Sequence, residues 1–281
     1  EKAQWDISKL TCQQTINETA LHRCVGLTIE TRPDYVSVQE IKRLRDLGCT
    51  RVELGVQTTD DAILNRIRRG HTHAHTAQAT KILKDAGFKV DYHLMPGLPG
   101  ATPEIDLLSA KEVFTDQRFV PDMIKIYPTV VTPNTELEEW WKNGTYVPYA
   151  TEALISLLAD IKSAVPPWMR ISRVIRDIPS DETVAGNQQT NLRQVIQSRM
   201  KERGMKCRCL RCREVGHKKT DLRFTIYDLR INLRERTYEA SDGVEHFLSY
   251  EDEETDTVFA FLRMRFPSKD ARLLWKHLPE L

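Results

Sequence analysis

The chain has 281 residues, of which 40% are hydrophobic and 29% charged, a composition typical of a folded protein of about two domains. Its 41 Lys and Arg nearly balance its 40 Asp and Glu, so the overall charge indicates no particular partner. No stretch approaches the roughly 18 consecutive apolar residues of a membrane span, and no secretory signal opens the chain. Clustered cysteines without a paired framework favour a reducing, cytoplasmic location.

Short apolar segments alternate with amphipathic segments up to residue 176. The pattern predicts strands at residues 25–30, 51–57, 88–95, 123–127 and 169–175. It predicts helices at residues 37–47, 75–86, 103–115 and 151–164, with a further short helix that Thr59 and Asp60 cap. Strands that alternate with helices form right-handed βαβ units, so we expect an α/β fold with a parallel sheet that forms a partial or complete barrel. The functional site of such a fold lies at the carboxyl ends of its strands.

Polar side chains and Gly/Pro turns follow four of these strands. Since the carboxyl ends of parallel strands meet at one edge of the sheet, their recurrence predicts a ligand pocket there. The segments are Glu30-Thr-Arg32-Pro-Asp34, Gly55-Val-Gln57, His93-Leu-Met95-Pro-Gly97-Leu-Pro-Gly100 and Lys125-Ile-Tyr127-Pro128.

Three histidines, His71, His73 and His75, stand two residues apart at the start of a predicted helix. Residues two apart on a helix do not face each other, so we predict a surface cluster here and not a metal site.

Cys207, Cys209 and Cys212 form a C-x-C-x2-C pattern, and His217 follows five positions later. Three thiolates with one further ligand are typical of a tetrahedral zinc site. His217 is one candidate for the fourth ligand, and a distant cysteine is the other. The alternative is three reduced cysteines in a solvated basic loop.

The cysteines lie in a basic segment, residues 193–219, that holds ten Lys and Arg against Glu202 and Glu214. Such a concentration of positive charge predicts binding to nucleic-acid phosphates. An acidic region, residues 235–256, follows, and we expect it to be a solvated hairpin. The candidate nucleic-acid contacts are Arg173, Arg176, Arg203, Lys206, Arg208, Arg211, Arg213, Lys218 and Lys219.

Four phrases of the sequence resemble the later half of a radical S-adenosylmethionine (SAM) barrel, and in particular the family of Elongator catalytic subunits. Members of that family join a radical SAM barrel to a GNAT-type acetyltransferase domain. The resemblance implies a tRNA-modifying enzyme that uses SAM, a [4Fe-4S] cluster and acetyl-CoA to carboxymethylate C5 of uridine 34. The phrases are Thr28-Ile-Glu-Thr-Arg-Pro-Asp34, Val52-Glu-Leu-Gly-Val-Gln57, Arg68-Arg-Gly-His-Thr72 and His93-Leu-Met-Pro-Gly-Leu-Pro-Gly100.

The same resemblance assigns roles to residues of the predicted pocket. It implies that Glu30, Gln57, Arg69 and His93 bind SAM. Glu30 suits the α-amino group of SAM and Arg69 suits its carboxylate, through charge-assisted hydrogen bonds. Lys125 and Tyr127 are the candidates for catalytic side chains that face the substrate.

The resemblance divides the chain into residues 1–178, the later part of the barrel; 179–221, a basic linker with the zinc site; and 222–281, the opening of the acetyltransferase domain. In the last part we predict strands at residues 222–233, 238–250 and 257–266 and a helix at 268–277. Cys12, Cys24 and Cys49 are spaced by 12 and 25 residues, which does not fit the C-x3-C-x2-C cluster motif. The cluster ligands are therefore expected upstream of Glu1, and no Gly-rich pyrophosphate loop precedes Leu281.

Two alternatives remain open from the sequence. One is a protein lysine acetyltransferase in which the barrel is a scaffold and the acidic region attracts a basic tail. The other is a non-catalytic module that binds RNA or other Elongator-type subunits.

Overall fold

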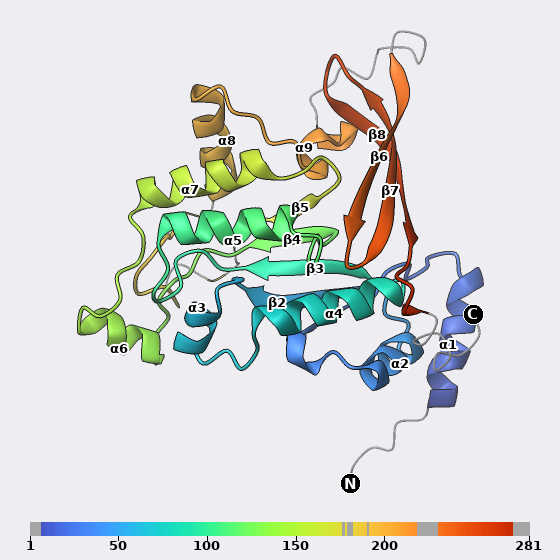
Figure 1. Ribbon diagram of the computed structural model, residues 1–281, viewed down its shortest axis with the longest axis horizontal. Coiled ribbons are helices and arrows are strands. Elements are labelled where there is room, and N and C mark those ends of the chain that lie inside the picture. The colour runs from blue at the N-terminus through green and yellow to red at the C-terminus, as the bar shows by residue number, and fades with distance from the viewer. Residues whose placement is uncertain (1–6, 176–177, 179–181, 190, 218–229, 272–281) are drawn as a thin grey trace.

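The computed structural model describes residues 7–175, 178, 182–189, 191–217 and 230–271 (Figure 1). Arg176, Lys218 and Lys219, three of the predicted tRNA contacts, lie outside these ranges. So do most of the strand predicted at 222–233 and most of the helix predicted at 268–277.

A five-stranded parallel sheet forms the centre of the larger part of the molecule, as predicted. Its strands lie side by side in chain order, and every neighbouring pair is parallel. The fold is therefore α/β. The strands are β1 (Thr28–Thr31), β2 (Arg51–Gln57), β3 (Lys89–Leu94), β4 (Met123–Ile126) and β5 (Arg170–Arg173).

Most helices begin at the side chains that the sequence marks as caps. Ser37 accepts a hydrogen bond from the backbone N–H of Glu40, and Asp60 accepts from Ala62 and Ile63. The chain shows further helices that the sequence analysis did not predict, at α1 (Ile7–Thr19), α6 (Glu136–Lys142), α8 (Leu192–Glu202) and α9 (Leu210–Arg213). The predicted helices are α2 (Val38–Asp46), α3 (Asp61–Arg66), α4 (His73–Asp85), α5 (Pro103–Thr115) and α7 (Thr151–Ala164), and short 3-10 turns lie at Pro33–Tyr35 and Val215–His217.

The two faces of the parallel sheet differ in chemistry because successive side chains of a strand point to opposite sides. Val52, Leu54, Tyr92 and Ile124 are fully buried in the hydrophobic core, to which α4, α5 and α7 also contribute. We call the opposite side the polar face and define it by Arg51, Glu53, Asp91, His93, Lys125 and Arg170. A functional site can form there because ionisable groups replace an apolar core.

A second, antiparallel sheet follows the basic segment. Its strands are β6 (Ile231–Ala240), β7 (Gly243–Asp252) and β8 (Thr257–Phe266), in the order β6-β7-β8. The predicted strand at 238–250 is wrong, because the chain reverses at Ser241 and Asp242, which have φ of 48° and 60°. Two left-handed residues followed by a strand form the tight hairpin turn whose twist matches that of the strands.

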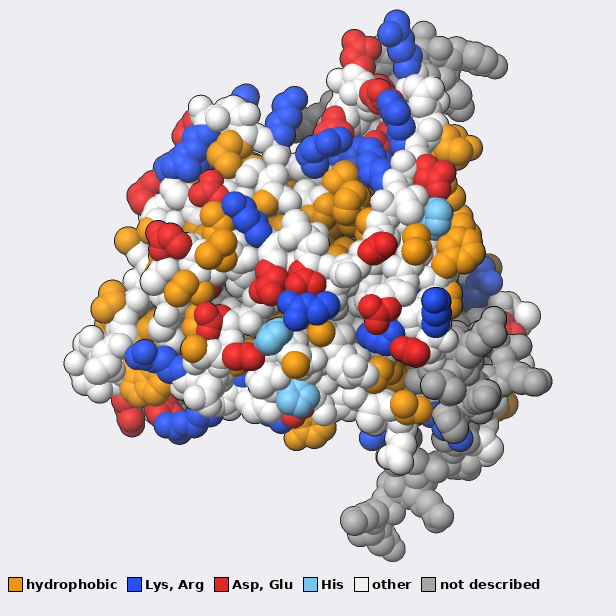
Figure 2. Space-filling model, viewed as in Figure 1, with side chains coloured by type: hydrophobic (Ala, Val, Ile, Leu, Met, Phe, Trp, Pro, Cys, Tyr) orange, Lys and Arg blue, Asp and Glu red, His pale blue; other side chains and the backbone are white. Residues whose placement is uncertain are grey.

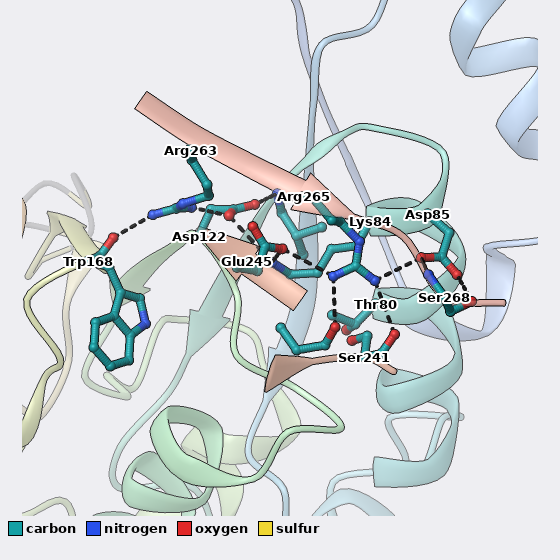
Figure 3. A network of polar contacts seen from close by, with 12 residues as sticks. Thr80, Lys84, Asp85, Asp122, Trp168, Ser241, Glu245, Arg263, Arg265 and Ser268 are labelled. Carbon is teal, nitrogen blue, oxygen red and sulfur yellow. Dashed lines mark hydrogen bonds and ion pairs between the residues drawn. The ribbon is translucent and has the colours of Figure 1, made fainter. Parts of the chain in front are cut away.

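Buried ion pairs attach this second sheet to the parallel sheet (Figure 3). Lys84 Nζ lies 2.9 Å from Glu245 Oε1 and 3.4 Å from Asp122 Oδ1. Arg263 pairs with the same Asp122, and Arg265 Nη2 lies 2.7 Å from Asp85 Oδ1. The expectation of a solvated acidic hairpin is therefore wrong for Glu245, which is 2% exposed, because α4 and β8 surround it with cations.

The remaining surface of β6–β8 carries hydrophobic side chains, visible at the right of Figure 2. Leu262, Met264 and Phe266 alternate along β8 and are all exposed. Elsewhere the same view shows a mixture of positive and negative side chains over the helices, without a large area of one sign.

Candidate functional site

A chain of ionisable side chains crosses the polar face towards the carboxyl ends of the strands. His93 Nε2 lies 2.9 Å from Glu53 Oε2, and His93 Nδ1 lies 3.2 Å from Glu30 Oε1. Glu53 and His93 are buried, whereas the side chain of Glu30 is 61% exposed. Both imidazole nitrogens therefore face carboxylates, one buried and one open to solvent.

Burial and hydrogen bonding act against each other at this pair. Burial lowers the pKa of His93 below its ordinary value, although the charge of Glu30 and the hydrogen bond with Glu53 oppose the change. For Glu53, burial favours the neutral acid, but hydrogen bonds from Lys125 and His93 prevail and lower its pKa. Glu53 is thus an ionised acceptor that orients both neighbours.

Lys125 and Tyr127, the predicted catalytic side chains, contact the Glu53–His93 pair. Lys125 Nζ forms an ion pair with Glu53, which raises the Lys125 pKa against the effect of burial. The ring of Tyr127 packs edge-on against His93, with centroids 5.3 Å apart, and burial raises its pKa. At neutral pH this geometry offers a fixed ammonium group and a neutral phenol that can donate a hydrogen bond.

Asp91 is a member of the site that the sequence analysis missed, as is Glu53. Its side chain is fully buried, Ser172 Oγ donates to Oδ2 at 3.4 Å, and Oδ1 has no partner among the described residues. Burial raises the pKa of Asp91 to about 7, and the nearby Glu53 contributes. An alternation of charged and apolar residues within β2 and β3 is the sequence signal for both groups.

Gln57 and Arg69 meet over Gly55 at the end of β2. Arg69 Nη2 donates to the carbonyl of Gly55 at 3.2 Å, and a Cβ on Gly55 would overlap the same guanidinium. Gln57 has a φ of 71°, a strained value outside glycine. Gln57 Oε1 and Arg69 Nε are buried and have no partner among the described residues. The charge of Glu30 acts on Arg69, so all four predicted SAM-binding residues converge.

His71 departs from the predicted surface cluster. It is 3% exposed, and its Nε2 lies 3.2 Å from the carbonyl oxygen of Val56, so burial lowers its pKa to about 4. His73 contacts Asp61, and His75 completes the capping box of α4 with Thr72. Each of the three histidines therefore makes a separate local contact.

The three cysteines of the C-x-C-x2-C motif come together. Their Sγ atoms lie within 4.8 Å of one another, a spacing that suits one metal ion. Cys209 is fully buried, and hydrogen bonds from Cys207 and Cys212 lower its pKa against the effect of burial. His217 is not in this group: its side chain is 46% exposed and its Nε2 lies 3.5 Å from Glu214 Oε2.

Cys12 and Cys24 are exposed, whereas Cys49 is buried with its Sγ 3.1 Å from the carbonyl of Arg51. Within the described ranges these three do not form a metal-binding group.

The predicted tRNA contacts fall into two classes. Arg173, Arg203, Lys206 and Arg208 are exposed, and Arg211 is half-buried. Arg213 is different, and its prediction as a tRNA contact is wrong. Its side chain is 1% exposed and its guanidinium pairs with Glu251 and Asp256 of the second sheet, so no RNA phosphate can reach it.

Two family models match much of the chain. Residues 5–108 match the Radical SAM superfamily, and residues 121–202 match the Radical_SAM C-terminal domain. The chain belongs to the radical SAM superfamily. The family implies SAM and an iron–sulfur cluster as cofactors. No helix of the described residues is long and apolar enough to cross a membrane.

Several relatives resemble nearly the whole chain. It is 50% identical over 267 residues to a protein of Methanocaldococcus jannaschii named tRNA uridine(34) acetyltransferase, covering 95% of this chain and 49% of that protein. It is 40% identical over 254 residues to Elongator complex protein 3 of Homo sapiens, covering 90% and 46%. The solved structure of Methanocaldococcus infernus Elp3 with an N-terminal deletion has a TM-score of 0.87 and 49% identity, covering 92% of this chain and 61% of that chain. The chain thus spans about half the length of the curated relatives it matches.

The residues at the carboxyl ends of the strands fit the methionyl part of SAM. Arg69 Nε and Gln57 Oε1 are buried without a partner among the described residues, so they can form hydrogen bonds with polar groups of a ligand. The carboxylate of Glu30 offers an acceptor for an ammonium group, and Arg69 offers a donor for a carboxylate.

Proposed function

We propose that this chain carries the SAM-binding and RNA-binding parts of a tRNA-modifying enzyme that acts in the cytoplasm on uridine 34. The proposed reaction is carboxymethylation at C5, with acetyl-CoA as co-substrate. The single observation that carries the proposal is the convergence of Glu30, Gln57, Arg69 and His93 around unpartnered polar atoms. The names of the relatives, tRNA uridine(34) acetyltransferase and Elongator complex protein 3, support the choice of substrate.

The residues of the site bind and orient in this proposal. Arg69 holds the carboxylate of SAM, Glu30 its ammonium group, and Gln57 and His93 further polar atoms of the same molecule. With a [4Fe-4S] cluster beside it, SAM bound by these residues would supply radical chemistry. Lys125 and Tyr127 face the substrate, Lys125 as a cation that Glu53 holds in place and Tyr127 as a neutral hydrogen-bond donor.

Zinc bound by Cys207, Cys209 and Cys212 would fix the basic segment against β5. The three Sγ atoms supply the soft ligands that zinc prefers, and the fourth ligand comes from another group, since His217 faces Glu214. Lys162 Nζ lies 3.9 Å from Cys212 Sγ and offsets part of the thiolate charge.

Exposed or half-buried cations in and near the basic segment bind the tRNA anticodon stem-loop by its phosphates. The set comprises Arg173, Arg203, Lys206, Arg208 and Arg211, with Arg176, Lys218 and Lys219 beyond the described residues. The same proposal takes residues 179–221 as a basic linker and residues 222–281 as the opening of an acetyltransferase-type domain. It also includes binding to other Elongator-type subunits.

A lysine acetyltransferase that attracts a basic tail to the acidic region is less well supported. Two acidic side chains of that region, Glu245 and Glu251, are buried and paired with cations of this chain. They therefore offer no charge to an external lysine tail.

Substitution of Arg69 tests the SAM site. Loss of a charge-assisted carboxylate contact costs about 1.5–3 kcal/mol, so Arg69→Ala should weaken SAM binding roughly ten- to a hundredfold in equilibrium dialysis. Arg68→Ala is the matched control, because Arg68 precedes Arg69 in the sequence but its side chain is 74% exposed and pairs with Glu136 away from the site. A folded Arg69→Ala protein that binds SAM as well as the wild type would rule out this pocket, and with it the proposed use of SAM here.

A further inference from the structure

Four arginine side chains converge at the amino-terminal end of the polar face, below the groups assigned to SAM. Arg51 begins β2, and its Nη1 donates to Met123 Sδ at 3.6 Å. Met123 is the residue of β4 that pairs with Arg170 of β5. The head group of Arg51 therefore reaches across β3 to the strand beside Arg170.

The other two arginines approach the same place from the basic segment. Arg193 Nη2, from α8, donates to the carbonyl of Ile171 at 3.2 Å, one residue beyond Arg170. The backbone N–H of Leu210 donates to the carbonyl of Met169 at 3.0 Å, which places Arg211 beside the start of β5. Three separate parts of the chain thus bring positive charge to one position.

The carboxylates that face this cluster of four arginines do not neutralise it. Arg170 pairs with Glu214, whose other oxygen faces His217. Arg51 Nη2 lies 3.5 Å from Glu53 Oε1, but Glu53 also serves Lys125 and His93. No carboxylate of the described residues pairs with Arg193 or Arg211, and Arg51 Nε is buried without a partner there.

Because few carboxylates lie nearby, the positive charges of the four arginines repel one another. Burial lowers the pKa of Arg170, and the charges of Arg211, Arg193 and Arg51 lower it further. The thiols of the cysteine group lie beside Arg193, and zinc bound to them would offset most of the charge of three thiolates. The side chains of Arg51 and Arg170 keep 33% and 24% of their surface exposed, so a solvent-borne anion can reach them.

We propose that Arg51, Arg170, Arg193 and Arg211 form a phosphate-binding site that takes a phosphodiester group of the bound RNA. Guanidinium groups donate paired hydrogen bonds that match a phosphate, and several converging on one point suit a single dianion or a phosphodiester. The source is an RNA strand because Arg211 also belongs to the basic segment, whose Arg203, Lys206 and Arg208 are exposed, so a strand bound to those side chains passes the cluster. This choice of ligand rests on the proposed tRNA-binding function.

Binding of inorganic pyrophosphate to the 281-residue chain tests the site without RNA. Isothermal titration would compare the wild type with Arg51→Gln and Arg193→Gln, which lie on different elements. Arg199→Gln is the matched control, because Arg199 is on the same helix as Arg193 but pairs with Glu152 and Glu202. Arg51→Lys keeps the charge, and bound zinc and thermal unfolding are measured for every variant.

We expect pyrophosphate affinity to fall at least tenfold in Arg51→Gln and Arg193→Gln, with Arg199→Gln unchanged and Arg51→Lys partly restored. Unchanged affinity in both glutamine variants would overturn the site, whether or not the protein binds tRNA.

A competition experiment tests separately whether the ligand of the site is RNA. Pyrophosphate should displace a labelled anticodon stem-loop, and Arg51→Gln should lower the slope of log K against log salt by about 0.7. If pyrophosphate binds the wild type but does not displace the RNA, the ligand is a free phosphate compound and the RNA assignment fails. Absence of any RNA binding by the wild type would instead contradict the proposed function, with the pyrophosphate result still deciding the site.

Discussion

Replacement of Arg213 separates structural from RNA-binding arginines of the basic segment. Arg213 Nη2 lies 2.5 Å from Glu251 Oε2, Nε lies 2.7 Å from Asp256 Oδ1, and Nη1 donates to the carbonyl of Pro167 at 3.3 Å. Loss of one partner of a buried pair costs about 3–5 kcal/mol. Arg236 Nη1 also lies 2.6 Å from Glu251 Oε1, so Glu251 keeps one cation. We therefore expect Arg213→Ala to lower the free energy of unfolding by about 2–4 kcal/mol.

Urea unfolding followed by circular dichroism measures this change, and a salt titration of RNA binding gives the second readout. Arg208→Ala is the control, since its side chain is 53% exposed and lies 3.9 Å from Asp256. It should cost under about 1 kcal/mol of stability but lower the RNA salt slope. A loss below about 1 kcal/mol in Arg213→Ala, or a larger fall in slope there than in Arg208→Ala, would refute the assignment.

Three further predictions concern the site and the cysteine group. Asp91→Asn should stabilise the protein by about 3–4 kcal/mol at pH 8 and by little below pH 4. Burial raises the folded-state pKa of Asp91 to about 7, so the wild type loses stability as the pH rises towards that value. An equal difference in unfolding free energy between variant and wild type at pH 4 and pH 8 would contradict this prediction. Gly55→Ala should displace Arg69 and weaken SAM binding about tenfold with little loss of stability, measured by dialysis and thermal unfolding. Cys209→Ser should lower bound zinc to below about half an equivalent by elemental analysis, and full retention would argue against the metal site.

Local patterns in the sequence determine most of the parallel sheet. Residues 103–115 and 151–164 form helices with the predicted bounds because both repeat apolar residues at helical spacing, and the first begins at Pro103 after the capping side chain of Thr102. The α8 helix was missed because its residues are mostly polar and its three buried side chains, Leu192, Ile196 and Met200, recur only every fourth position. The turn at Ser241 was missed although Asp242-Gly243 is a strong hairpin signal.

The candidate site was predictable only in part, for a physical reason. Glu30, Gln57 and His93 lie at or next to the carboxyl ends of β1, β2 and β3, so the topology alone brings them together. Glu53 and Asp91 lie further from the carboxyl ends of their strands. The role of Glu53 depends on His93 and Lys125, which are 40 or more residues away in the sequence. The burial of Arg213 also depends on a distant partner, Glu251, which local charge density does not reveal.

The attachment of the second sheet by charges has a consequence for the order of folding. Among the described residues, the buried apolar cluster of β6–β8 consists of Phe247 and Val258 from the sheet and Leu210 from α9, with the partly buried Tyr238 of β6 packed against it. Three strands with so small an apolar cluster are marginal alone, so their stability depends on Lys84 of α4 and Asp122 before β4. These partners precede the strands in the chain. We expect the parallel sheet to form first as the chain is synthesised, and β6–β8 to acquire protection from hydrogen exchange only after α4 and β4 are in place.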